Sequence, residues 1–183
     1  MVIDKTKMVT KVLAVICALC AVLGLVQTLK AFILYRFVVT LADVALAFVC
    51  FKGIGKDKEI CVGVYGVMAV FEIVRVFLEE SLNLSSGILM LLRILCYVAI
   101  VAYLLGVIKN KMVPIIGGSI VSLLLLKNLY NLIMIYKNMP TFMGGMKITG
   151  DTIFHMVGIA AYIVPTLVIT ILIATDAVKI IKE

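Results

Sequence analysis

The most informative residues of the sequence are charged and strongly polar side chains that interrupt long apolar stretches. A charge near the centre of a lipid bilayer costs at least about 2.5–3.5 kcal/mol, so each such residue requires a partner or a function. The candidates for a ligand-binding site are Arg36, Asp43, Glu72, Arg75, Arg93, Lys127, Asn131 and His155.

Arginine and lysine are distributed differently along the chain. All of the arginines (Arg36, Arg75 and Arg93) lie within apolar stretches, whereas the lysines stand at the edges, with Lys127 as the exception. The planar guanidinium forms forked hydrogen bonds with carboxylate or phosphate, whereas the lysine ammonium is a mobile, strongly hydrated point charge. This distribution predicts a ligand that is a small anion.

Helical spacing places several polar residues on shared faces, because residues three or four positions apart are neighbours on a helix. The faces are Arg36/Thr40/Asp43, Tyr65/Met68/Glu72/Arg75, Arg93/Tyr97, Lys127/Asn131 and His155/Tyr162/Thr166. If these faces turn inward, they form a polar pocket that opens to the outer side of a membrane. We expect Arg36 or Lys127 to neutralise Asp43. We expect the three arginines to converge on one anionic group, backed by Asn131 and His155.

Other chemistry has little support in the sequence. Asp151 and His155 form a pair at helical spacing, but a metal site needs three or four ligands. We predict no catalytic residues, no metal and no cofactor. The pair Cys17 and Cys20 lies within the first apolar stretch, where cysteine packs as a small hydrophobic residue. The net charge of +7 is spread singly along the chain, which argues against nucleic-acid binding.

Composition identifies the elements that must position these residues. The chain is 64% hydrophobic and its mean hydropathy is +1.26, too apolar for a water-exposed globule of 183 residues. A helical span needs about 20 mostly apolar residues. The sequence predicts an all-α transmembrane bundle that forms one membrane domain over residues 1–183. The six expected spans are 12–29, 32–51, 60–78, 88–107, 113–136 and 152–178, with a kink or tilt at Pro165.

The lysines predict the orientation of the bundle, because cytoplasmic loops carry an excess of positive residues. With the N-terminus inside, the cytoplasmic side receives Lys5, Lys7, Lys52, Lys56, Lys58, Lys109, Lys111, Lys179 and Lys182. The outer side receives Lys30, Lys137 and Lys147 together with Glu79 and Glu80. We predict a protein of the cell membrane with both termini in the cytoplasm and an outer loop over 137–150.

The architecture resembles that of the substrate-binding subunits of energy-coupling-factor vitamin transporters. The resemblance covers the whole chain in helix number, cytoplasmic termini and an outward pocket, without a diagnostic motif. It implies substrate binding from outside and a separate energising partner, since the sequence holds no P-loop motif. The small residues Ala14, Ala18 and Ala21 in the first span permit close helix packing, against either a partner subunit or another span.

Three functional hypotheses follow. The first is a membrane protein that binds or translocates a small anionic solute from the outer side. The second is an interaction with lipid headgroups or polyprenyl phosphate, as in a flippase, an immunity protein or an assembly protein. The third is an intramembrane enzyme, although no nucleophile and base stand in a recognisable arrangement.

Overall fold

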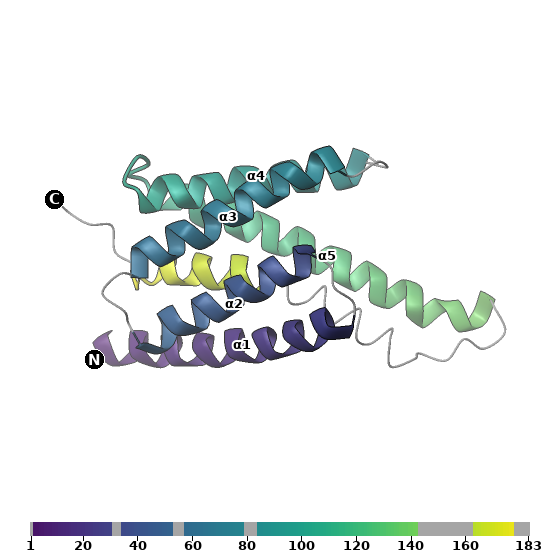
Figure 1. Ribbon diagram of the computed structural model, residues 1–183, viewed down its shortest axis with the longest axis horizontal. Coiled ribbons are helices and arrows are strands. Elements are labelled where there is room, and N and C mark those ends of the chain that lie inside the picture. Colours follow the sequence, from purple (N-terminus) through teal and green to yellow (C-terminus); the bar gives the residue numbers. More distant parts are fainter. Residues whose placement is uncertain (1, 31–33, 53–56, 79–83, 143–162, 178–183) are drawn as a thin grey trace.

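The computed structural model describes residues 2–30, 34–52, 57–78, 84–142 and 163–177 (Figure 1). The labelled helices are α1 (Val2–Lys30), α2 (Leu34–Lys52), α3 (Asp57–Leu78), α4 (Leu84–Leu104) and α5 (Met112–Phe142). A further apolar helix, Ile163–Ala174, follows them, and we call it the C-terminal helix. The chain is an all-α bundle, as the sequence predicted.

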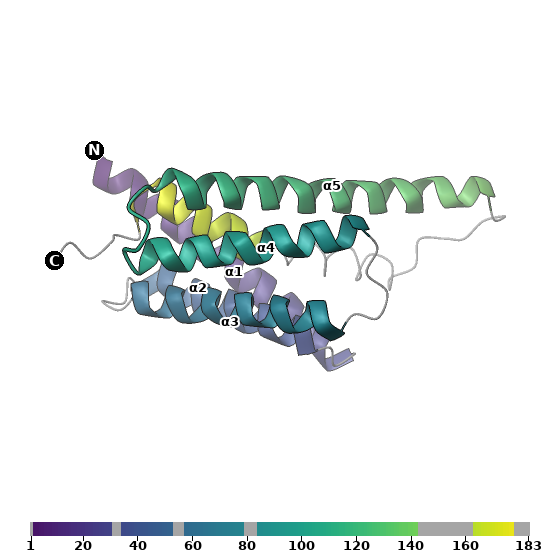
Figure 2. The ribbon, with the colours of Figure 1, turned by 90° about the horizontal axis from the view of Figure 1, so that it is seen from above.

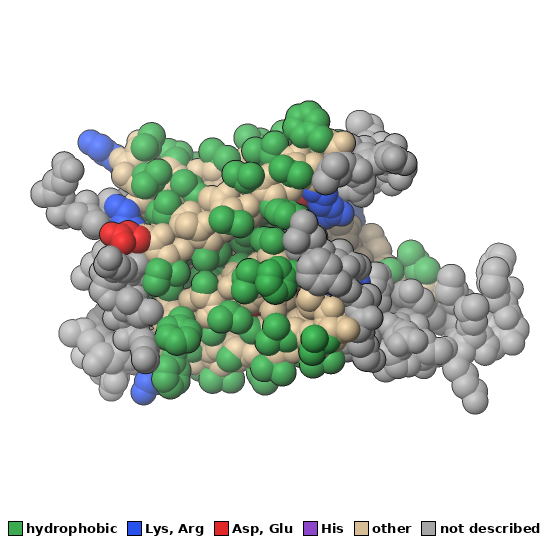
Figure 3. Space-filling model, viewed as in Figure 1, with side chains coloured by type: hydrophobic (Ala, Val, Ile, Leu, Met, Phe, Trp, Pro, Cys, Tyr) green, Lys and Arg blue, Asp and Glu red, His purple; other side chains and the backbone are tan. Residues whose placement is uncertain are grey.

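Length and surface chemistry both suit a membrane. Four segments are long and apolar enough to cross a bilayer within the described residues: Met8–Leu29, Lys58–Phe77, Gly87–Leu104 and Met112–Ile135. Large apolar side chains on their outer faces are exposed, among them Leu19, Val70, Leu95 and Leu123. Apolar side chains cover the middle of the face in Figure 3, and the basic side chains of the described part lie near its two ends. The fold is therefore that of a helical membrane protein.

Successive helices run in opposite directions and pack in chain order, α1 on α2, α2 on α3, α3 on α4 and α4 on α5 (Figures 1 and 2). One end of the bundle holds the start of α2, the end of α3 and the start of α4. We call it the arginine end, because Arg36, Arg75 and Arg93 belong to the halves of these helices nearest to it.

The C-terminal helix lies inside the bundle. Ile163, Val168, Ile169, Leu172 and Ile173 are all buried. It contacts α3 through Pro165, α4 through Thr166 and α5 through Thr170. A helix that is apolar on nearly all sides is expected to lie in such a core. This central helix therefore supplies polar backbone and hydroxyl groups to the interior.

The turn between α4 and α5 shows how local sequence sets the helix ends. Gly106 adopts a φ of 80°, a conformation that suits glycine at a helix C-terminus, and α4 ends at Leu104. The Asn110 side chain then accepts a hydrogen bond of 2.9 Å from the Met112 backbone N–H, as an N-cap residue does. Pro114 follows in the first turn of α5, where its missing N–H leaves no helical bond unmade.

Of the labelled helices, α1 and α5 extend furthest beyond the expected spans. α1 begins at Val2 rather than at residue 12, and α5 continues to Phe142. The expected outer loop 137–150 is thus helical over its first residues, and the remainder lies outside the described residues. Helical hydrogen bonding does not stop where hydropathy falls, so a helix can continue past the end of an apolar stretch. The kink expected at Pro165 is untested, because the described part of that helix begins at Ile163.

Candidate functional site

An ion pair between α3 and α4 lies inside the bundle. Nη2 of Arg93 is 2.5 Å from Oε1 of Glu72, and the two residues are 4% and 0% exposed. α3 and α4 are antiparallel neighbours, so Glu72, six residues before the end of α3, meets Arg93, nine residues after the start of α4. The pair places two compensating charges in the half of the bundle nearest to the arginine end.

A layer of hydroxyl groups follows along the same two helix faces. The Tyr65 hydroxyl donates a hydrogen bond of 2.6 Å to the Pro165 carbonyl oxygen. The Tyr97 hydroxyl lies 3.4 Å from Oγ1 of Thr166, and the centroids of the two tyrosine rings are 6.0 Å apart. Tyr65, Tyr97 and Thr166 are fully buried. These contacts join α3 and α4 to the C-terminal helix.

Asp43 is the third polar feature of the interior. It lies at the middle of α2 and is 1% exposed. Neither carboxylate oxygen has a hydrogen-bond partner in the described part of the chain. Its electrostatic neighbours include Cys17 and Cys20 of α1 and Tyr65 of α3. An acidic side chain therefore stands between three helices without a compensating cation among the described residues.

The expected partners of Asp43 are not observed. Arg36 lies seven residues earlier on α2, about 10.5 Å along the helix axis, and is half-buried. Lys127 is exposed on α5, a helix that packs on α4 rather than on α2 in the described structure. The prediction that Arg36 or Lys127 pairs with Asp43 was therefore wrong. Sequence spacing gives the face of a helix but not the neighbour that this face meets.

The remaining candidate residues lie in different surroundings. Arg75 is half-buried in the last turn of α3, and Asn131 is exposed on α5. His155 lies outside the described residues. The structure brings Glu72 and Arg93 together and places Arg36 and Arg75 nearer to the same end of the bundle. Lys127 and Asn131 do not line the interior. The convergence of three arginines on one anion remains a prediction.

Sequence reasoning missed the Glu72–Arg93 pair, for which a signal existed. Glu72 and Arg93 stand at comparable distances along the sequence from the short 79–83 connection. A connection this short makes the two helices that it joins antiparallel neighbours, so residues at comparable distances from it come close together. The bond from Tyr65 to the Pro165 carbonyl had no comparable signal, because it depends on the central position of the C-terminal helix. In contrast, the expected inward faces are buried at Tyr65, Met68, Glu72, Arg93 and Tyr97, and Arg75 is half-buried.

Metal and disulfide chemistry find no support in the described residues. No group of three or more His, Cys, Asp or Glu side chains is arranged there to hold a metal ion. The free thiols are Cys17, Cys20, Cys50, Cys61 and Cys96.

The small-residue stripe of α1 is not one open face. Ala14 and Ala21 are buried, whereas Ala18 is exposed.

Comparisons with protein-family models, curated proteins and solved structures find no match. The resemblance to energy-coupling-factor subunits therefore stays a prediction from the sequence. Fold and interior define the class: a helical membrane protein with a buried ion pair, a tyrosine layer and a buried acid.

Proposed function

We propose that the protein binds a small anionic solute at the arginine end and moves it through the membrane. The observation that carries this proposal is the burial of Arg93 inside the bundle, held by Glu72 of the neighbouring helix. A buried ion pair contributes little net stability compared with apolar residues of the same size. Ionisable residues inside membrane proteins mark solute and ion pathways more often than packing sites.

The arrangement of charge favours an anion. Arg36 and Arg75 are half-buried on α2 and α3, nearer to the arginine end than Arg93. Among the buried and half-buried side chains described near this end, the three guanidinium groups outnumber the carboxylate of Glu72. A carboxylate or phosphate group entering there meets the outer guanidinium groups first. The anion then competes with Glu72 for the forked N–H donors of the Arg93 guanidinium. Glu72 thus acts as a counter-ion that the solute replaces.

The proposal includes an orientation and a partner. The arginine end faces the outside of the cell membrane, and both termini lie in the cytoplasm. Since the sequence holds no P-loop motif, ATP-driven transport requires a separate energising subunit in the membrane.

Ligand-induced stabilisation of the purified protein tests the binding site, because a ligand that binds the folded state raises the unfolding temperature. One arm titrates inorganic phosphate and a short dicarboxylate, with chloride as the reference salt. The other arm titrates anionic phosphatidylglycerol in mixed micelles, with phosphatidylcholine as the reference. Saturable stabilisation by a free anion supports a solute. Stabilisation by phosphatidylglycerol alone assigns the same arginines to lipid headgroups. Stabilisation by neither contradicts the proposal.

A matched pair of charge deletions shows whether the arginines bind the anion. Arg75→Gln and Lys109→Gln each remove one positive charge, and Lys109 is exposed at the opposite end of the bundle. We expect Arg75→Gln to weaken anion binding about tenfold, or ~1.4 kcal/mol, and Lys109→Gln to leave it unchanged. Arg75→Lys should also weaken binding, because lysine keeps the charge but loses the fork. Equal effects of the two deletions would indicate unspecific attraction.

A further inference from the structure

A charged carboxylate at the position of Asp43 would be extremely costly. The residue lies in the middle of an apolar helix, is 1% exposed, and has no hydrogen-bond partner for either oxygen among the described residues. The membrane interior offers no water to replace these bonds. An ionised group in such surroundings becomes neutral unless a cation or hydrogen-bond donors compensate it.

The groups that face Asp43 offer no such compensation. α1 contributes the free thiols Cys17 and Cys20, and α3 contributes Tyr65. The Tyr65 hydroxyl hydrogen is already donated to the Pro165 carbonyl oxygen. On its own helix, the Thr40 hydroxyl donates to the Arg36 carbonyl oxygen at 2.8 Å. The neutral, proton-carrying acid is the form that fits this arrangement.

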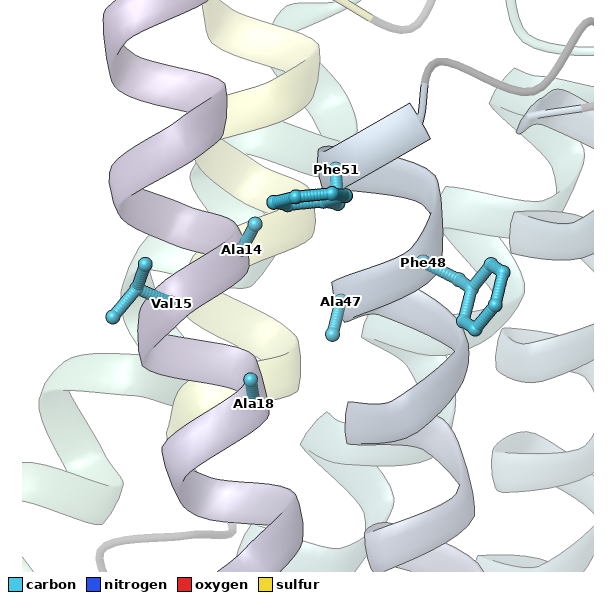
Figure 4. A pocket seen from close by; sticks show the side chains of 6 residues that line it. All are labelled: Ala14, Val15, Ala18, Ala47, Phe48 and Phe51. Carbon is cyan, nitrogen blue, oxygen red and sulfur yellow. The ribbon is translucent and has the colours of Figure 1, made fainter.

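The seam between α1 and α2 is incompletely filled close to this acid. An apolar groove of about 400 Å³ lies between the two helices, with Ala14, Ala18 and Ala47 toward its centre and Phe51 beside them (Figure 4). Ala47 is one helical turn after Asp43, and Ala18 is adjacent to Cys17. The small side chains leave less interlocking between α1 and α2 at this level than at the close contact between Gly24 and Thr40, so a local displacement of α1 around this groove would uncover the carboxyl group.

We propose that Asp43 is an intramembrane proton-binding site. In the arrangement described here the carboxyl group carries a proton. When α1 moves away from α2, the proton passes to water and leaves a carboxylate that favours the opened seam. An equilibrium between two arrangements shifts toward the one that binds a species more tightly. Proton uptake therefore closes the α1–α2 seam, and proton release opens it. This inference stands independently of anion binding at the arginine end.

Dicyclohexylcarbodiimide tests the protonation state of Asp43 in the intact chain. A carboxylic acid adds to this apolar reagent, its proton passing to a carbodiimide nitrogen as its oxygen bonds the central carbon, and the product rearranges to a stable acylurea. We expect mass spectrometry to locate the adduct on Asp43, with labelling that falls about tenfold per pH unit once the acid ionises. Glu72 is an internal control, because it is equally buried but paired with Arg93. We expect it to remain unlabelled. Labelling of Glu72 alone contradicts the proposal.

A second measurement covers the case in which the reagent cannot reach Asp43. It uses the variant Asp43→Asn, which keeps the size of the side chain and its neutral state. Infrared difference spectra of wild type minus Asp43→Asn should contain the carbonyl stretch of a protonated carboxylic acid. A pure carboxylate signature overturns the inference, whatever the labelling. At about pH 4, where an aspartate of an unfolded chain begins to ionise, the variant should unfold at the wild-type temperature. As pH rises above this value, the wild type should lose stability relative to the variant, because the carboxyl group then ionises in the unfolded chain while the folded chain keeps it neutral. A variant that fails to fold shows that Asp43 acts through its charge, which also overturns the inference.

Discussion

The folded protein should be destabilised when only one partner of the Glu72–Arg93 ion pair is removed. Glu72→Gln would leave the Arg93 guanidinium buried without its carboxylate, and such a loss costs about 3–5 kcal/mol. Glu72→Gln combined with Arg93→Met should recover much of this stability, because both charges are then gone. The measurement is reversible unfolding of the purified protein in detergent, monitored by circular dichroism.

The exposed pair between Lys111 and Asp176 provides the control. Its two contacts of 3.0 Å join the start of α5 to the residues after the C-terminal helix. Both side chains are accessible to solvent, so Lys111→Ala should cost at most about 1 kcal/mol. If Glu72→Gln were no more destabilising than Lys111→Ala, the two buried charges would not be interacting as the structure places them.

Close helix contacts depend on two glycines. A Cβ at Gly24 would overlap Oγ1 of Thr40, and a Cβ at Gly118 would overlap Oγ1 of Thr170. Neither threonine can rotate away without giving up its hydrogen bond to the carbonyl oxygen four residues earlier. The α1–α2 contact and the contact between α5 and the C-terminal helix therefore have no room for an added methyl group.

Alanine substitutions should consequently have opposite effects at different glycines. Gly24→Ala and Gly118→Ala should destabilise the protein by about 1–3 kcal/mol through overpacking. Gly63→Ala and Gly66→Ala on α3 meet nothing within 4 Å, so the better helix propensity of alanine should stabilise by up to about 1 kcal/mol. Unfolding midpoints of the four variants check this ordering. A destabilised Gly66→Ala together with a tolerant Gly118→Ala would contradict the packing.

The helices could be predicted from sequence because hydropathy and length specify them without knowledge of their neighbours. The inward faces of α3 and α4 were also predictable, since Tyr65, Glu72, Arg93 and Tyr97 recur at helical spacing. The partners of these faces were not. Asp43 was assigned to Arg36 or Lys127, although seven residues separate Arg36 from it and α5 packs elsewhere. Partner choice depends on how helices rotate and pack, and the pattern of one sequence does not contain that information.

The bundle has a largely apolar core that holds a few buried polar groups, and its outer surface is apolar. The Glu72–Arg93 pair lies in the half nearest to the arginine end, the tyrosine layer follows it, and Asp43 is at the middle of α2. The opposite end holds Lys109 and the exposed Lys111–Asp176 pair. This asymmetry is the basis for proposing that solute enters from the arginine end, which the lysine distribution predicts to be the outer end.

Cysteine accessibility in intact cells tests this orientation, on which the binding proposal depends. Cys17, Cys20, Cys50, Cys61 and Cys96 are first replaced by alanine. Met143→Cys then adds a thiol directly after the last residue of α5, and Lys109→Cys adds one at the opposite end of the bundle. A membrane-impermeant maleimide should label the thiol at position 143 in intact cells and the thiol at position 109 only after permeabilisation. A thiol at position 143 that reacts only from the cytoplasm would contradict the orientation and an anion site open to the outside.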